Sequence, residues 1–112
     1  MGEKGPTLSN QATGVSEWLT QSLAALGNIT AKKMFGGYGI FESGIMFALI
    51  DSSGEIFLKV DDTNRSKYEK IQARSHGRMP YYQIPAEVLN DDHNFQDWAK
   101  LSIEIAHKLQ KK

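Results

Sequence analysis

The stretch YGIFESGIMFALIDSSGEIFLKVD, residues 38–61, contains short apolar runs separated by two turn sequences. Residues 38–42, 45–51 and 55–61 are predicted to be strands, because Ser43-Gly44 and the later Ser-Ser-Gly are typical of tight turns. In the third run, Ile56, Leu58 and Val60 alternate with Phe57 and Lys59. Strands joined by such short turns predict an antiparallel sheet with one face against the core.

Helical periodicity flanks this stretch on both sides. Apolar residues recur at spacings of three and four from Gln11 to a capping Gly27, and again from Phe95 to Leu109. The first stripe contains Val15, Trp18, Leu19, Leu23 and Leu26, and the second contains Phe95, Trp98, Ala99, Ser102, Ile105, Ala106 and Leu109. Further elements are expected at 29–35 (strand), 63–73 (a charged helix packed through Tyr68 and Ile71), 81–84 (strand) and 85–89 (helical). The order helix, strands, helix, strand, helix predicts an α+β fold of two layers, an antiparallel β-sheet packed against helices.

Length and composition narrow the classes of protein. The 112 residues suit one domain, which we expect over residues 11–112, with residues 1–10 as a disordered tail. Thirteen basic and thirteen acidic residues give zero net charge, which counts against a general nucleic-acid binder. Without cysteine there is no disulfide framework or thiol chemistry. No apolar run is long enough to span a membrane and no signal sequence is recognisable, so a cytoplasmic protein without membrane contact is expected.

The glycine cluster in KKMFGGYGIF, residues 32–41, raises the question of a phosphate-binding loop. A dinucleotide fingerprint needs a helix after its glycines, and a P-loop needs Lys and Ser or Thr after a glycine. Here a strand follows Gly39, and no P-loop sequence occurs in the chain. We therefore expect Gly36, Gly37 and Gly39 to permit a bend and close backbone approach.

Catalytic and metal-binding patterns are weak. His76, His93 and His107 share no motif, and no second histidine lies at the spacing that zinc sites use. Asp61 and Asp62 suit the start of a helix better than an acid–base pair, since adjacent strand residues face opposite ways. The sequence thus predicts no catalytic residue, no metal ligand and no cofactor.

An ordered series of motifs resembles the TfoX N-terminal domain family. The series is TAKKMFGGYGIF (30–41), GIMFALI (44–50), FLKVDD (57–62), MPYYQIP (79–85) and the closing helix that contains Trp98, and the resemblance covers about residues 15–108. It implies a bacterial, cytoplasmic, non-enzymatic domain of proteins linked to competence genes and DNA uptake. It also implies an α+β fold similar to that of type III secretion chaperones. The full-length competence regulator has a second, helical C-terminal domain; because this chain stops at Lys112, a single-domain member is expected.

The resemblance and the strand patterns together suggest a contact surface for a protein partner or a second copy of the chain. Its candidates are Lys33, Met34, Phe35, Tyr38, Phe57, Lys59, Tyr81 and Tyr82, although large apolar residues such as Met34 and Phe35 are more often core. A less favoured alternative is nucleic-acid binding through Lys32, Lys33, Lys59, Arg65 and Lys67. A small enzyme would require a pocket that collects Asp61, His76 and Tyr82.

Overall fold

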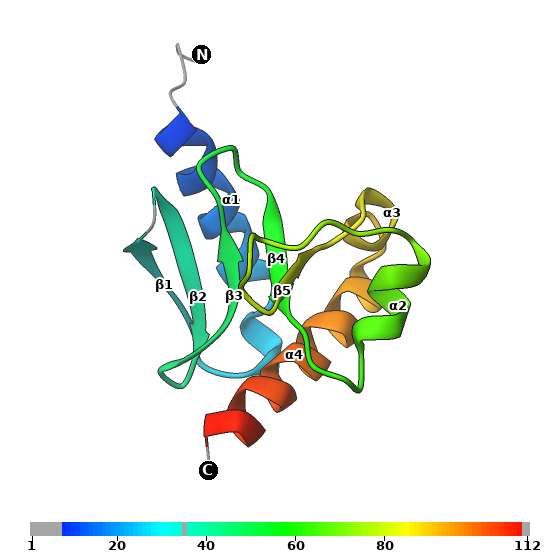
Figure 1. Cartoon of the computed structure of the whole chain (residues 1–112). Coiled ribbons are helices and arrows are strands. Elements are labelled where there is room, and N and C mark those ends of the chain that lie inside the picture. Colours follow the sequence, from blue (N-terminus) through cyan, green and yellow to red (C-terminus); the bar gives the residue numbers. More distant parts are fainter. Residues whose placement is uncertain (1–7, 35, 111–112) are drawn as a thin grey trace.

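The computed structural model describes residues 8–34 and 36–110 (Figure 1). Its elements in chain order are α1 (Leu8–Ser22), the 3₁₀ turn η1 (Ala24–Leu26), β1 (Ile29–Met34), β2 (Gly37–Glu42), β3 (Ile45–Ile50), β4 (Ile56–Lys59), α2 (Arg65–Lys70), β5 (Tyr81–Gln83), α3 (Ala86–Leu89) and α4 (Asp92–Gln110). The predicted α+β class and the predicted order of elements are confirmed. Of the expected interaction residues, Phe35 lies outside the described residues, as does most of the predicted tail.

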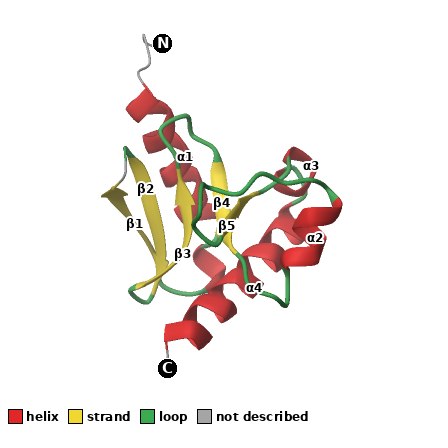
Figure 2. Cartoon of the chain, viewed as in Figure 1, coloured by secondary structure: helices red, strands yellow, loops and turns green. Residues whose placement is uncertain are grey.

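The strands form one antiparallel sheet in the order β1-β2-β3-β4-β5. Two helices cover one face: α1 packs on β1 and β2, and α4 packs on β3 and β4 (Figures 1 and 2). Short helices α2 and α3 lie beyond the β5 edge. We call the face turned away from α1 and α4 the open face. The molecule is therefore a two-layer structure in which β1 and β5 form the edges of the sheet.

The turn between β2 and β3 is of the kind that the sequence predicts. Glu42 and Ile45 lie opposite each other, which leaves Ser43 and Gly44 as a two-residue loop. Both have positive φ, 52° and 86°, as a type I′ turn requires. The right-handed twist of this turn matches that of the flanking strands, so the hairpin closes without a longer loop.

A bulge in β3 changes which side chains reach the core. Ile40 pairs with Ala48 whereas Phe41 pairs with Met46, so Phe47 is an extra residue. Phe47 and Ala48 are consequently both buried against the helices, while Met46 packs on the open face. The alternation of side-chain faces along β3 is interrupted at this point.

The main core lies between the sheet and the helices α1 and α4. Its largest members include Leu19, Leu23, Ile40, Phe47, Leu58, Tyr68 and Phe95. Not every predicted stripe residue enters it: Trp18 is 42% exposed and Leu109 is also 42% exposed. Trp18 instead stacks on Phe95 from outside, with ring centroids 5.7 Å apart.

Helix α2 is shorter than the expected span 63–73. It ends in a Schellman motif, because Ala73 N–H donates to Tyr68 O and Gln72 N–H donates to Glu69 O, each at 3.0 Å. Gln72 occupies the left-handed position of this motif with φ 58°. Glycine normally marks that position, so the sequence contained no stop signal. Ile71, expected to pack, is 41% exposed as a result.

Other element ends also differ from expectation. Helix α1 begins at Leu8 and not near Gln11, and it ends at Ser22, so that Gly27 follows η1 and does not cap α1. Strand β4 covers only Ile56–Lys59. Val60 N–H still donates to Pro80 O, but proline has no N–H to donate in return, and the chain turns at Asp61. Asp61 and Asp62 precede the helix, but Asn64 is its N-terminal flanking residue.

Two polar contacts hold α4 against the sheet. Ser102 Oγ, on α4, donates to Lys59 O at 2.8 Å; the same oxygen also accepts a bond from the buried side-chain amide of Asn64, which precedes α2, at 3.3 Å. Near the end of α4, His107 Nε2 lies 2.7 Å from the Glu42 carboxylate. Hydrogen bonds from the Ser43 hydroxyl and the backbone of Asn28 lower the pKa of Glu42, and His107 adds to this.

Candidate interaction surface

Three of the predicted surface residues lie on the helix-covered face of the sheet. Directly opposed strand residues share a face, and Lys33 is opposite Tyr38 on the side of the core residue Ile40. Tyr82 is opposite Leu58, which is also core. The Tyr38 hydroxyl hydrogen bonds with Thr13 Oγ1 at 2.8 Å, which connects β2 to α1.

Four other predicted residues lie on the open face. Phe57 is opposite Gln83 and Lys59 is opposite Tyr81, both out of phase with the core residue Leu58. Lys32 pairs with Gly39, which is out of phase with the core residue Ile40, so Lys32 is on the open face. Met34, opposite Gly37 and two residues after Lys32, is on the same face. The sheet therefore divides the predicted set into two groups that do not form one surface.

Phe57 and Tyr81 are more buried than a contact surface requires. They are 2% and 4% exposed and form a small cluster with Leu49, against which Met46 and Met79 pack. The segment between α2 and β5 crosses this part of the open face (Figure 1), and His76 from that segment meets the Phe57 ring edge-on at 4.9 Å. Burial raises the pKa of Tyr81 to about 12. The Lys59 ammonium lies 5.1 Å from the centre of the same ring.

An apolar cluster occupies the uncovered part of the open face. Around Gly39, a β-carbon would meet Met34 Sδ at 2.5 Å, Met46 Sδ at 3.1 Å and Phe41 Cε1 at 3.1 Å. Met34, Phe41 and Met46 are each only half-buried. We call these three residues the methionine cluster. Sequence reasoning identified Met34 but missed Phe41 and Met46, since their common face depends on the bulge at Phe47.

The basic residues considered for nucleic-acid binding do not form a continuous strip. Lys32 and Lys33 are exposed on β1, at one edge of the sheet. Arg65 and Lys67 are on α2, beyond the opposite edge (Figure 1). There Arg65 pairs with Asp62 at 2.5 Å, and the Lys67 ammonium lies 4.6 Å from the centre of the Trp98 ring.

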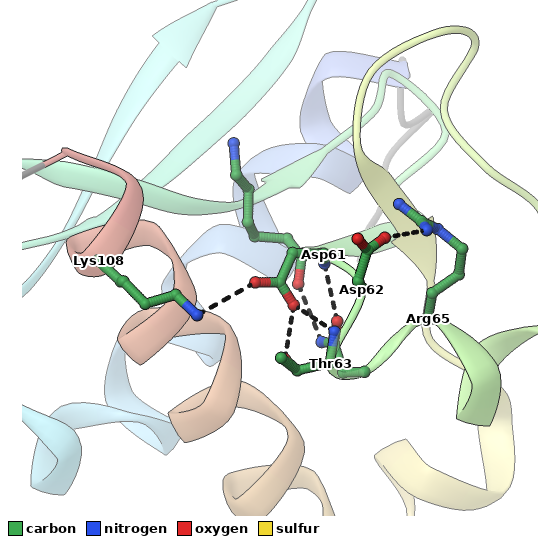
Figure 3. Close-up of polar contacts among 7 residues, drawn as sticks. Asp61, Asp62, Thr63, Arg65 and Lys108 are labelled. Carbon is green, nitrogen blue, oxygen red and sulfur yellow. Dashed lines mark hydrogen bonds and ion pairs between the residues drawn. The ribbon is translucent and has the colours of Figure 1, made fainter. Parts of the chain in front are cut away.

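Asp61, His76 and Tyr82 are likewise not gathered into one pocket. Figure 3 shows Asp61 bound by Thr63, whose N–H and hydroxyl donate to its Oδ1 at 2.8 and 2.6 Å, and by Lys108 at 3.6 Å from Oδ2. The Thr63 hydroxyl is the main reason that the pKa of Asp61 is lowered, and Lys108 contributes less. Tyr82 lies on the helix-covered face while His76 packs on the open face. The sheet itself separates these two side chains.

The described residues contain neither a cluster of metal ligands nor a helix that could span a membrane. Within residues 8–34 and 36–110, no three side chains of His, Asp or Glu come close enough to hold a metal ion. Nor does any helix in this part of the chain have the length and apolar character needed to cross a membrane.

Comparison with known proteins gives one result. No curated protein matches the chain. The family model of the TfoX N-terminal domain matches residues 21–106, which contain the whole sheet and most of α4. The match covers the motifs that produce β1, the bulged β2–β3 hairpin, β4 and β5. The chain therefore belongs to the TfoX N-terminal domain family.

Proposed function

We propose that this domain is a cytoplasmic, non-enzymatic protein-interaction module with a regulatory role, in a family that is linked to competence regulation. The observation that carries the proposal is the methionine cluster, Met34, Phe41 and Met46, on the open face of the sheet. Methionine and aromatic side chains adapt to the shape of a partner and contribute large contact areas. Lys32 on the same face supplies a polar margin, as interaction surfaces commonly have.

The use of the polar side chains supports a non-enzymatic role. The Asp61 carboxylate accepts hydrogen bonds from Thr63 and forms an ion pair with Lys108. The Ser102 hydroxyl donates to the backbone of β4. Groups that perform acid–base catalysis need access to a substrate and a shared site. His76 and Tyr82 lie on opposite faces of the sheet, whereas Asp61 and Ser102 bond to other parts of the fold.

The test is capture of proteins from a native lysate by the tagged domain, with and without nuclease. Met46→Lys introduces a charge into the methionine cluster and should abolish retention of the partner. Ile71→Lys is the matched control, because it places the same charge on an exposed apolar residue beyond the other edge of the sheet. It should retain the partner. Circular dichroism must show that both variants are folded.

Retention of the same proteins by Met46→Lys would contradict the proposal. Nucleic acid retained without protein, and lost on treatment with nuclease or salt, would favour nucleic-acid binding instead, because phosphate contacts weaken steeply with ionic strength.

A further inference from the structure

Every second residue of β1 directs its backbone N–H and C=O groups to the outer edge of the sheet, where they have no partner among the described residues. Ser43 N–H donates to Asn28 O at 2.9 Å, and the register places these two residues opposite each other. Hydrogen-bonded and non-bonded pairs alternate along an antiparallel ladder. Thr30, Lys32 and Met34 therefore bond to β2. Ile29, Ala31 and Lys33 direct their N–H and C=O groups away from the sheet, where none of the described residues provides a partner.

The opposite edge of the sheet is protected. Beside β5, His76 N–H donates to Tyr81 O and Gln83 N–H donates to Arg74 O, each at 2.8 Å. Ser75 also forms a β-bridge with Tyr82. One edge is therefore capped by the chain's own segment 74–76, whereas β1 presents six residues, of which the central four are exposed.

The charge of β1 indicates what kind of strand could pair with its outer edge. The exposed side chains of β1 include two adjacent lysines, Lys32 and Lys33, and β1 itself has no acidic residue. Because successive strand residues face opposite ways, one lysine lies on each face of the sheet. A strand added beside β1 would meet both lysines with two consecutive residues of its own. Acidic residues at those positions would form ion pairs across the strands.

We propose that β1 accepts an extended acidic segment of a partner protein as a sixth strand. The proposal rests on the interaction function proposed above and names its site and the chemistry of the partner. Strand addition to an exposed edge is an established mode of peptide recognition, in which backbone bonds supply affinity and alternate side chains supply specificity. On the open face, the side chain next to Met34 would also reach the methionine cluster.

A second copy of the chain is a poorer occupant of the same edge. Two β1 strands paired antiparallel about Ala31 would place Lys32 opposite Thr30 and Lys33 opposite Ile29 of the other copy, with four lysines among twelve strand residues. No acidic residue of β1 would offset them, and the two Lys32 side chains would be diagonal neighbours on one face, where like charges repel. Lysine on an edge strand is a common means of preventing such pairing.

The test uses a defined probe, the capped peptide Val-Glu-Glu-Val-Thr-Val, which places its two glutamates opposite Lys33 and Lys32 when antiparallel to β1. Amide hydrogen exchange of the domain is followed by NMR with and without the peptide. Binding at the edge should slow exchange at Ile29, Ala31 and Lys33. Thr30, Lys32 and Met34 should change little, since they already bond to β2.

Two sets of variants locate the effect. Ala31→Pro removes an outward N–H and should abolish binding, and proline is tolerated at such edge positions. Combined Lys32→Glu and Lys33→Glu should weaken binding at least ten-fold and should create binding to the lysine version of the peptide, Val-Lys-Lys-Val-Thr-Val. The control combines Lys70→Glu with Lys100→Glu, which makes the same charge change at exposed positions on α2 and α4 and should bind as the wild type does.

The outcomes separate this inference from the proposed function. Absence of peptide binding, or binding without the alternating exchange pattern, would overturn the inference. So would a dimer in sedimentation that Ala31→Pro dissociates, because the occupant would then be a second copy. Lysate capture that is lost in Met46→Lys but kept in Ala31→Pro would leave the interaction function standing and remove β1 as its site.

Discussion

Replacement of Gly37 by alanine should destabilise the domain strongly, although the change adds only a methyl group. A β-carbon at this position would lie 1.8 Å from the carbonyl oxygen of Ile50 and 2.9 Å from its carbonyl carbon. These atoms belong to the backbone of β3, next to the pair Tyr38–Ile50. No rotamer change can relieve the overlap, so the two strands must move apart.

The size of the effect follows from what the movement disrupts. Overpacking that side chains can partly absorb costs about 1–3 kcal/mol. Here the obstacle is main chain, and separation of β2 from β3 also weakens at least one backbone hydrogen bond, which adds about 1 kcal/mol. We expect Gly37→Ala to lower the free energy of unfolding by about 2–4 kcal/mol, a large fraction of the roughly 5–15 kcal/mol that a domain has.

Gly14→Ala is the matched control. Gly14 lies inside α1 and is exposed, and a β-carbon added there would have no neighbouring atom within 4 Å. Alanine is the better helix former, so the same substitution should stabilise the domain by about 0.5–1 kcal/mol. Urea unfolding followed by circular dichroism measures both variants. A Gly37→Ala midpoint equal to that of the wild type, at unchanged slope, would refute the argument from close backbone approach.

Three further predictions concern single side chains. Gln72→Gly should raise the free energy of unfolding by about 1 kcal/mol in urea titrations, because it relieves the left-handed backbone at the end of α2; a loss of stability would contradict the motif. Ser102→Ala, which removes the bond to β4, should cost about 1 kcal/mol in the same assay, and an unchanged midpoint would show that the bond contributes nothing. Glu42 has a lowered pKa, so it stabilises the fold above its unfolded pKa of about 4.3 and this stabilisation is lost as pH falls through the folded pKa. Between pH 7 and pH 2, the free energy of unfolding should therefore fall less in Glu42→Gln than in the wild type. An equal fall in both proteins would exclude this role of Glu42.

The sheet and the long helices could be predicted because their signals are local. Ser43-Gly44 specifies its turn through backbone preference, and the stripes of α1 and α4 repeat often enough to define a buried side. Boundaries set by rarer backbone choices could not be predicted. Gln72 ends α2 in a conformation that its side chain does not favour, and nothing in the sequence marks it.

The candidate surface was harder to predict because it depends on contacts between distant segments. Phe57 has the alternation of an outward strand residue, yet the segment that carries His76 and Met79 covers it. Conversely, Phe41 and Met46 share a face only because Phe47 bulges. The alternation of apolar and polar residues predicts which side chains of a strand share a face. It does not predict which face another part of the chain will cover, or where a bulge will shift the alternation.

The two lysines of β1 combine two effects that are often treated separately. An exposed edge strand can pair with another extended chain, and a second copy of the same protein is one such chain. Lys32 and Lys33 oppose that pairing because the other copy brings the same charges. The same charges attract a strand with acidic residues, so a single feature disfavours the wrong partner and selects the proposed one. This explains why the outer edge of β1 can do without a partner from residues 8–34 and 36–110, while β5 is covered by segment 74–76. It also predicts that neutralising both lysines, with Lys32→Gln and Lys33→Gln, weakens binding of the acidic peptide and at the same time promotes self-association. Sedimentation and peptide titration on one sample would measure both, and a variant that loses the peptide without gaining self-association would show that the lysines select a partner but do not guard the edge.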